Sequence, residues 1–328
     1  MVTIFPPLYP LLFDEIYKTT LWGGDKIYQY KGEKPPCHSI GETWEISPLE
    51  GNISVISNGF LRGKNLNEVA LEYGEKLLGR EVMERYEGQF PLLVKLIDAQ
   101  SDLSVQVHPS DAYAQEKGIG WGKTEMWYLL SNTPDARIRF GWTKETDPCQ
   151  LRELVKSDAV MEYIGSYKSH PGDVFYISPG KVHTIGAGNL LLEIQQASNT
   201  TYRLYDFNRT DADGNKRPLH IEQAMEVIDY GVNNGGTLTY DRTLTDTPIT
   251  LVDCPYFTTR LLQLTKSYHC NLEPRQSFTI LFVEDGEVIL NDELPLRRGQ
   301  ITLIPACIKE ISIALSSPKA KLVEAYIR

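Results

Sequence analysis

The sequence predicts a mostly β protein with an antiparallel sandwich or barrel architecture, in two related copies, with helices confined to small inserts. Three observations lead to this prediction. Short runs of strand-forming residues alternate with Gly, Pro, Asn and Asp along most of the chain. Helical spacing of apolar residues is limited to a few segments. A run ending near residue 183 is also similar to one ending near residue 309.

The strand-forming runs are short and closely spaced. In the first two thirds of the chain they predict strands at residues 43–47, 92–98, 103–107, 125–130, 137–142, 173–177, 189–195 and 201–205. Farther along they predict strands at residues 256–264, 278–283, 287–290, 301–304, 310–314 and 321–326. Many short strands divided by turn residues are typical of an antiparallel sandwich or barrel.

Helical spacing is found in three segments. Apolar residues recur at near-helical intervals over residues 65–86, where Gly74 and Gly79 are expected to interrupt the helix. Residues 146–164 predict a second helical insert. Residues 221–228 predict a short helix that leads out of the first domain.

A boundary between two domains is predicted near residues 230–247. Glycine and asparagine cluster at the start of this segment, and a Thr/Asp-rich stretch without apolar periodicity follows. We therefore expect a larger domain at residues 1–235, which includes the two helical inserts and carries the catalytic residues. A degenerate copy of its β domain is expected at residues 236–328.

The two copies are linked by one internal similarity. The run from Gly172 to His183 resembles the run from Gly299 to Lys309 when their prolines are matched with one gap. The later copy ends in a lysine where the earlier one ends in a histidine. This difference predicts that any site involving His183 is absent from the second copy.

Bulk composition excludes several classes of function. The 328 residues are 41% hydrophobic and carry a net charge of −10, so the chain lacks the basic footprint that binds nucleic acid or anionic membranes. No run approaches the roughly 20 apolar residues that span a bilayer, and residues 1–18 do not have the pattern of a signal peptide. We expect a cytoplasmic protein whose partner is a small molecule.

The cysteines give no sign of a disulfide framework or a thiolate metal site. The chain has five, at Cys37, Cys149, Cys254, Cys270 and Cys307, and no two of them form a Cys-x-x-Cys motif. We expect these thiols to be reduced and mostly buried, as small apolar side chains usually are.

Two histidines, a carboxylate and an amide mark a candidate metal site. Alternate residues of a strand share a face, so Gln106 is expected to lie beside His108, and Lys123 beside Glu125. His183 ends a third strand-like run. Nitrogen and oxygen donors without thiolate suit zinc or non-haem Fe(II), and two histidines with one carboxylate leave coordination positions open for a substrate. The pattern therefore indicates a catalytic metal.

An ordinary role is available for each of these residues taken alone. His108 precedes a proline and suits a turn, Glu125 suits a surface strand end, and His183 suits a loop hydrogen bond. Each nevertheless lies next to a strongly apolar stretch. Polar side chains on the core side of a strand are costly to bury unless a partner satisfies them, and a metal ion is such a partner.

The segments around these residues resemble a known family. The matching motifs run in order through Leu21-Trp-Gly-Gly24, Gly41-Glu-Thr-Trp-Glu-Ile-Ser47, Pro91-Leu-Leu-Val-Lys95, Leu103-Ser-Val-Gln-Val-His-Pro109, Gly122-Lys-Thr-Glu-Met-Trp127, Pro179-Gly-Lys-Val-His183 and Thr201-Tyr-Arg-Leu-Tyr-Asp206. Together they are similar to the short bacterial form of type I mannose-6-phosphate isomerases (phosphomannose isomerases), which belong to the cupin superfamily.

The resemblance implies a cupin fold, a double-stranded β-helix or jelly-roll barrel, and one Zn²⁺ ion per chain. It implies an aldose–ketose isomerase that interconverts mannose 6-phosphate and fructose 6-phosphate through an enediolate. The family's ligands fall on His108, Glu125 and His183, with Gln106 as a further ligand in longer members. The family's catalytic arginine falls on Arg203. The chain lacks the Asn-His-Lys-Pro-Glu signature of those longer members.

Several cationic and aromatic residues are candidates for the substrate. Lys123 and Arg203 are candidates both for catalysis and for substrate binding, because each can stabilise charge on the sugar oxygens or bind phosphate. Lys95 and Trp22 are further substrate-binding candidates, and Lys181 and Trp44 are weaker ones. The base remains open between a metal-bound water, Lys123 and a carboxylate, and the oligomeric state is undetermined.

Two alternative functions use the same residues. A cupin dioxygenase with Fe(II) has the same two-histidine, one-carboxylate set. A non-catalytic cupin that binds sugar and keeps its metal is the second alternative. Lys123 and Arg203 favour an enzyme, because a binding protein does not need both beside a metal.

Overall fold

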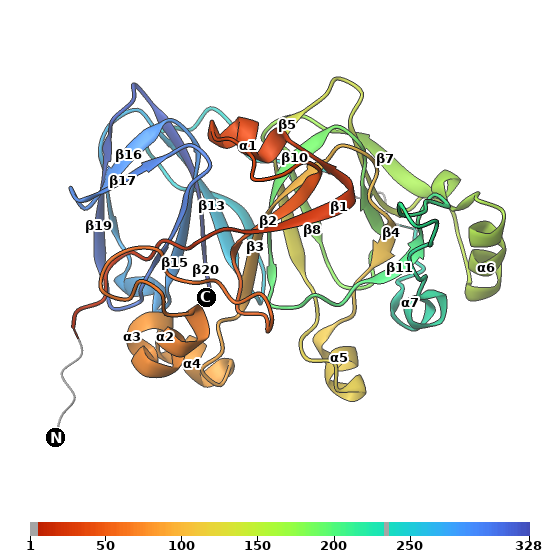
Figure 1. The fold of residues 1–328 in the computed structure, drawn as a ribbon, viewed down its shortest axis with the longest axis horizontal. Coiled ribbons are helices and arrows are strands. Elements are labelled where there is room, and N and C mark those ends of the chain that lie inside the picture. Colours follow the sequence, from red (N-terminus) through yellow and green to blue (C-terminus); the bar gives the residue numbers. More distant parts are fainter. Residues whose placement is uncertain (1–5, 233–235) are drawn as a thin grey trace.

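The computed structural model describes residues 6–232 and 236–328, which form four antiparallel sheets arranged as two pairs (Figure 1). In each pair, one cluster of buried apolar side chains fills the space between the two sheets. The mostly β prediction is confirmed. No helix within the described residues has both the length and the apolar composition to cross a membrane.

The first sheet pair contains the candidate ligands. Its six-stranded sheet has the order β1 (Ile16–Gly24), β2 (Ile40–Ile46), β3 (Leu92–Ala99), β10 (Asn189–Gln196), β5 (Glu125–Asn132) and β8 (Val174–Ile177). Its five-stranded sheet has the order β11 (Tyr202–Tyr205), β4 (Val105–Val107), β9 (His183–Ile185), β6 (Arg137–Trp142) and β7 (Ile164–Lys168).

The second sheet pair repeats this plan with fewer strands. Its five-stranded sheet has the order β12 (Ile249–Asp253), β13 (Thr258–Leu264), β20 (Ala320–Tyr326), β15 (Thr279–Asp285) and β18 (Ile301–Ile304). Its four-stranded sheet has the order β14 (Tyr268–Asn271), β19 (Glu310–Leu315), β16 (Glu287–Leu290) and β17 (Leu294–Arg297). Taken in chain order, β12 to β20 occupy the sheet positions of β2 to β10. This correspondence supports the predicted repeat.

The helices lie outside the sheets and are short. They are α1 (Lys26–Lys31), α2 (Leu66–Tyr73), α3 (Glu75–Leu78), α4 (Arg80–Arg85), α5 (Asp111–Lys117), α6 (Pro148–Lys156) and α7 (Ile221–Val227), with single 3-10 turns η1 (Val160–Glu162) and η2 (Glu273–Arg275). The predicted helical segments correspond to α2–α4, to α6 with η1, and to α7. The sequence patterns did not indicate α1 and α5.

The breaks predicted within the first helical insert are present. Gly74 separates α2 from α3, and Gly79 separates α3 from α4. Gly79 has φ +92°, and a Cβ atom there would lie 2.0 Å from the carbonyl oxygen of Gln276. Only glycine allows this approach, because it has no Cβ and accepts a positive φ.

Each predicted strand overlaps an observed one. The six strands that the patterns missed are β1, β7, β9, β12, β14 and β17. Five of these, β7, β9, β12, β14 and β17, have five residues or fewer, and β17 contains a proline. Such short runs do not show the period-2 alternation on which a strand prediction depends.

The two sheet pairs are held together by one apolar core. It includes Val94 and Met126 from the first pair with Phe282 and Val323 from the second, so the larger sheets of the two pairs share it. Helices α2–α4 add their apolar faces to the same core. Burial of this much apolar surface is the main stabilising contribution to the contact between the pairs.

Two segments of the first half pack against the second sheet pair. Leu11 exchanges backbone hydrogen bonds with Leu303 of β18. The backbone carbonyls of Leu77 and Leu78 accept hydrogen bonds from Ala306 and Phe278. Figure 1 shows the same arrangement, with α2, α3 and α4 beside β15 and β20.

The domain boundary stays a prediction. Residue 235, at which the first domain was expected to end, lies outside the described residues, as do residues 233 and 234. Leu238 donates a backbone hydrogen bond to Val174 of β8, and Tyr240 Oη donates one to Gly172, so residues beyond the proposed boundary still contact the first sheet pair.

The expectation about the cysteines is partly wrong. All five are free thiols, but Cys149 and Cys307 are exposed and the other three are only partly buried. Cys149 lies in the first turn of α6 and Cys307 follows β18, so both are outside the sheet cores.

Replacing Phe282 with alanine tests the shared core. Phe282 is 1% exposed, and its loss should lower the free energy of unfolding by about 3–5 kcal/mol because a cavity would remain between the sheet pairs. Urea denaturation measures this change. Leu71→Ala is the control, since Leu71 is 86% exposed and its loss should have little effect. Equal stability of the two variants would show that the core does not join the pairs.

Candidate metal centre and adjoining cavity

Three candidate ligands converge at the ends of three strands. His108 follows β4, Glu125 begins β5 and His183 begins β9. Their ligand atoms all lie within 4.8 Å of one another, and all three residues are buried. Nε2 of His108 and Nε2 of His183 each lie 3.4 Å from a different Glu125 oxygen. Among the described residues, this is the one group of His, Cys, Asp or Glu side chains found close enough to share an ion.

Backbone carbonyls orient both imidazoles. Nδ1 of His183 lies 2.8 Å from the carbonyl oxygen of Lys181, and Nδ1 of His108 lies 3.1 Å from that of Thr200. Each Nδ1–H therefore donates to a carbonyl, which leaves the Nε2 lone pair directed at Glu125, as a metal ligand requires. Burial lowers the pKa of His108 to about 3 and also lowers the pKa of His183, so both rings are neutral at neutral pH.

The centre contains polar atoms that the protein does not satisfy. Nε2 of His108 and both carboxylate oxygens of Glu125 are buried and have no hydrogen-bond partner among the described residues. Although burial opposes ionisation, the ammonium of Lys123 and then the imidazole of His108 hold the pKa of Glu125 well below its usual value. Buried and unsatisfied donor atoms of this kind are costly, and a divalent cation would satisfy all of them. The residues therefore fit a metal.

Gln106 lies beside the same centre. Register places it opposite His183 across β4 and β9, and its Nε2 is 3.3 Å from Nε2 of His183. In this orientation the amide nitrogen faces the ring. A ligand role requires the opposite orientation of the amide, which would turn the oxygen toward the ion.

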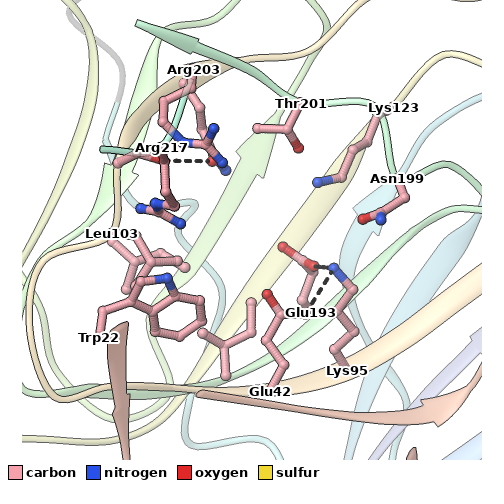
Figure 2. Close-up of a pocket in the computed structure, with 14 residues that line it drawn as sticks. Trp22, Glu42, Lys95, Leu103, Lys123, Glu193, Asn199, Thr201, Arg203 and Arg217 are labelled. Carbon is pink, nitrogen blue, oxygen red and sulfur yellow. Dashed lines mark hydrogen bonds and ion pairs between the residues drawn. The ribbon is translucent and has the colours of Figure 1, made fainter. Parts of the chain in front are cut away.

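A polar cavity of about 260 Å³ adjoins the centre (Figure 2). It is lined by Trp22, Glu42, Lys95, Ile97, Leu103, Ser104, Gln106, Lys123, Ile185, Glu193, Asn199, Thr201, Arg203 and Arg217. Lys123 connects it to the ligands, because Nζ of Lys123 lies 3.2 Å from Glu125 Oε2. A small polar molecule in the cavity can therefore reach an ion held by the ligands.

A buried ion-pair network forms one wall of the cavity. Nζ of Lys95 lies 3.2 Å from Glu193 Oε1 and 3.6 Å from Glu42 Oε2. Glu193 also accepts a hydrogen bond from Nε1 of Trp127 at 2.9 Å. Burial raises the pKa of Glu193, whereas at Glu42 Lys95, the Trp44 hydrogen bond and Lys123 together outweigh burial and lower the pKa. The two carboxyl groups thus differ in proton affinity, as in acid–base sites.

Arg203 lines the opposite part of the cavity. Its Nη1 donates to the carbonyl oxygen of Pro218 at 2.9 Å, and register places it opposite Gln106. It forms no ion pair with Asp206 or Glu193, the two partners that an ordinary structural role would have required. Asp206 is bound instead by Arg209 and Arg217.

Most sequence-predicted site residues come together. The four ligand candidates share one centre, and Trp22, Lys95, Lys123 and Arg203 line the cavity beside it. Two weaker candidates, Lys181 and Trp44, do not line the cavity. Lys181 lies outside the lining and its Nζ pairs with Asp229 at 2.6 Å, and Trp44 lies behind Glu42, to which its Nε1 donates at 2.6 Å. His108 and Lys123 were expected within strands, but each lies just beyond a strand end.

Sequence reasoning missed three charged residues of the cavity. Glu193 stands within the apolar run 190–194, and its charge was a usable signal. Glu42 belongs to a motif that had no chemical role assigned. Arg217 comes to the cavity from the connection between β11 and α7, and no local pattern indicates this.

Known proteins are similar to this chain in sequence and fold. A sequence profile described as phosphomannose isomerase type I, catalytic domain, matches residues 11–132. Mannose-6-phosphate isomerase ManA of Bacillus subtilis is 35% identical over 309 residues, which cover 93% of this chain and 95% of that protein. The crystal structure of mannose 6-phosphate isomerase from Bacillus subtilis has a TM-score of 0.86 at 30% identity, covering 97% of this chain and 99% of that one. A zinc-bound mannose 6-phosphate isomerase, 15% identical, shares the fold with a TM-score of 0.78, covering 97% of this chain and 99% of that one.

Metal content should depend on His108 and His183 but not on Lys309. His108→Ala and His183→Ala each remove one donor from a three-residue centre, so purified protein should contain little bound metal. Lys309→Ala, in the second copy, should keep the wild-type metal content. Elemental analysis after gel filtration measures both. Loss of metal in the Lys309 variant would contradict the interpretation of the repeat.

Proposed function

The chain belongs to the type I mannose-6-phosphate isomerase family, and we propose that it interconverts mannose 6-phosphate and fructose 6-phosphate with one bound zinc ion. The observation that carries the proposal is the buried set of His108, Glu125 and His183, in which Nε2 of His108 and both Glu125 oxygens are unsatisfied, next to a cavity lined with cations. A sugar phosphate is a polar anion of a size that such a cavity accepts.

Zinc is the proposed metal, held by the two histidines and Glu125, with Gln106 as a further donor. Nitrogen and oxygen donors suit zinc, and one relative with the same fold is zinc-bound. The donor chemistry alone equally suits Fe(II), but membership of an isomerase family favours zinc and isomerisation over a dioxygenase. When bound, the metal polarises the sugar oxygens and stabilises negative charge on them.

The residues of the cavity supply the proton transfer. Isomerisation moves one proton between C1 and C2 of the open-chain sugar and another between the oxygens O1 and O2, through a proposed enediolate. Glu193 is the residue to which we assign the proton, because burial raises its pKa toward the range useful for acid–base catalysis. Lys95 holds this carboxyl at 3.2 Å, and Lys123 is placed to donate to a sugar oxygen near the ligands.

Arg203 stabilises the charge that develops during the reaction. It stands opposite Gln106 in the sheet and is free of carboxylate partners among the described residues, so its charge is available to the substrate. Donors aimed at developing charge contribute most in the transition state. The alternative of a non-catalytic sugar-binding protein gives no reason for this arginine or for the Lys95–Glu193 pair.

Chelation should abolish formation of fructose 6-phosphate from mannose 6-phosphate, and Zn²⁺ should restore it. The reason is that the substrate oxygens would lose their stabilising cation. A coupled assay for fructose 6-phosphate measures the reaction. Full activity in metal-free protein would contradict the zinc proposal. Restoration of activity by Fe(II) with oxygen consumption would favour the dioxygenase.

Arg203→Ala should lower kcat by about 100-fold or more, since donors to developing charge act mainly in the transition state. Zinc content and thermal stability should stay at the wild-type level, because Arg203 is outside the ligand set. Steady-state kinetics with elemental analysis check both expectations. A variant changed only in KM would make Arg203 a ground-state binding residue.

A further inference from the structure

The cations of the cavity differ in how fully they are neutralised. Lys95 faces two carboxylates, Glu42 and Glu193. Lys123 faces Glu125. Each lysine is thus already paired with a carboxylate in a buried setting. A phosphate group therefore needs a different part of the cavity.

Three arginines surround one carboxylate at the other end. Asp206 is bound by Arg217 through two hydrogen bonds, Nε to Oδ2 at 2.7 Å and Nη2 to Oδ1 at 2.6 Å. Nη2 of Arg209 reaches the same carboxylate at 2.5 Å. Arg203 lies alongside, tied to the carbonyl of Pro218. Among the described residues, Asp206 is the one carboxylate that pairs with any of these guanidinium groups, through Arg209 and Arg217, which leaves two positive charges in excess.

The excess positive charge affects the pKa of Arg203. Burial, then the neighbouring charges of Arg217 and Arg209, lower the pKa of Arg203. A dianion placed among these groups would neutralise the two excess charges and relieve their repulsion.

Arg217 has the geometry to bind that dianion. Its Nε and Nη2 are held by Asp206, and its Nη1 makes no hydrogen bond to a described residue. Its side chain is 27% exposed and lines the cavity. Figure 2 shows Arg203 and Arg217 on one side of the cavity and Lys95, Lys123 and Glu193 on the other. The guanidinium is thus fixed in place with donors left for a ligand.

We propose that Arg217, oriented by Asp206, binds the phosphate group of the substrate, while Arg203, which lies opposite Gln106 in the sheet, keeps its role at the reacting oxygens. For the identity of the substrate this inference rests on the proposed function. The phosphate of a hexose 6-phosphate is attached at the end of the sugar remote from C1 and C2. Binding it at the arginine side directs C1 and C2 toward Lys123 and the metal ligands. Phosphate binding and the reaction at C1 and C2 would therefore take place at opposite ends of one cavity.

Arg217→Gln compared with Lys216→Gln tests this assignment. Both changes remove one positive charge from adjacent residues, but Lys216 is exposed, bonds Asn208 and does not line the cavity. Titration calorimetry with inorganic phosphate should show affinity about 10- to 100-fold weaker in the Arg217 variant, as expected for loss of a charge-assisted hydrogen bond. The Lys216 variant should bind phosphate as the wild type does. Arg209 still pairs with Asp206 in both variants, which favours folding.

Kinetics give a second measurement. For mannose 6-phosphate, Arg217→Gln should raise KM by a similar factor at unchanged zinc content, and Arg217→Lys should recover part of the loss. Wild-type affinity for phosphate in the Arg217 variant, or equal losses in both glutamine variants, would overturn the inference. An inactive wild type would contradict the proposed function alone, because the phosphate titration decides the role of Arg217 independently.

Discussion

A carboxylate buried between two neutral imidazoles is the constraint on which the site depends. Within the described residues, neither oxygen of Glu125 has a hydrogen-bond partner, and the ammonium of Lys123 lies 3.2 Å from Oε2. Desolvation of an ionised carboxylate costs several kcal/mol unless a cation compensates it. The strand ends that carry His108 and His183 have to converge there, and the backbone carbonyls that orient the rings follow from the same requirement.

In the second sheet pair, arginine side chains lie beside the buried carboxylate of Glu324. Lys95 lies opposite Glu193 across β3 and β10, and Arg260 lies opposite Glu324 across β13 and β20. Arg275 also contacts Glu324 at 3.0 Å and donates to Thr279, which has the strand position of Glu125. A guanidinium thus satisfies the buried groups of this copy. In this copy a buried Arg–Glu cluster lies where the first copy has the Lys95–Glu193 pair.

Sequence patterns predicted the features that depend on neighbouring residues in the chain, namely most strands and the ligand candidates. Strand alternation and family motifs located the four ligand candidates, because these lie at or beside strands with strong apolar neighbours. The patterns did not place Arg217, since its approach to the cavity depends on a long connection folding back over β11. The patterns gave Glu193 no role in the cavity, because register across β3 and β10 decides that it meets Lys95. Long-range register of this kind cannot be extracted from periodicity alone.

The contact between Leu11 and β18 has a consequence for how a cell makes this protein. Oγ of Thr302 donates to the carbonyl oxygen of Leu11 across a separation of 291 residues. A ribosome that adds about 5–20 residues per second needs a quarter of a minute or longer to deliver that partner. Until then the second sheet pair, against which the N-terminal segment and the apolar faces of α2–α4 pack, is incomplete. Nascent chains are therefore exposed to chaperones and proteases for most of synthesis, and the enzyme becomes protected only near its release.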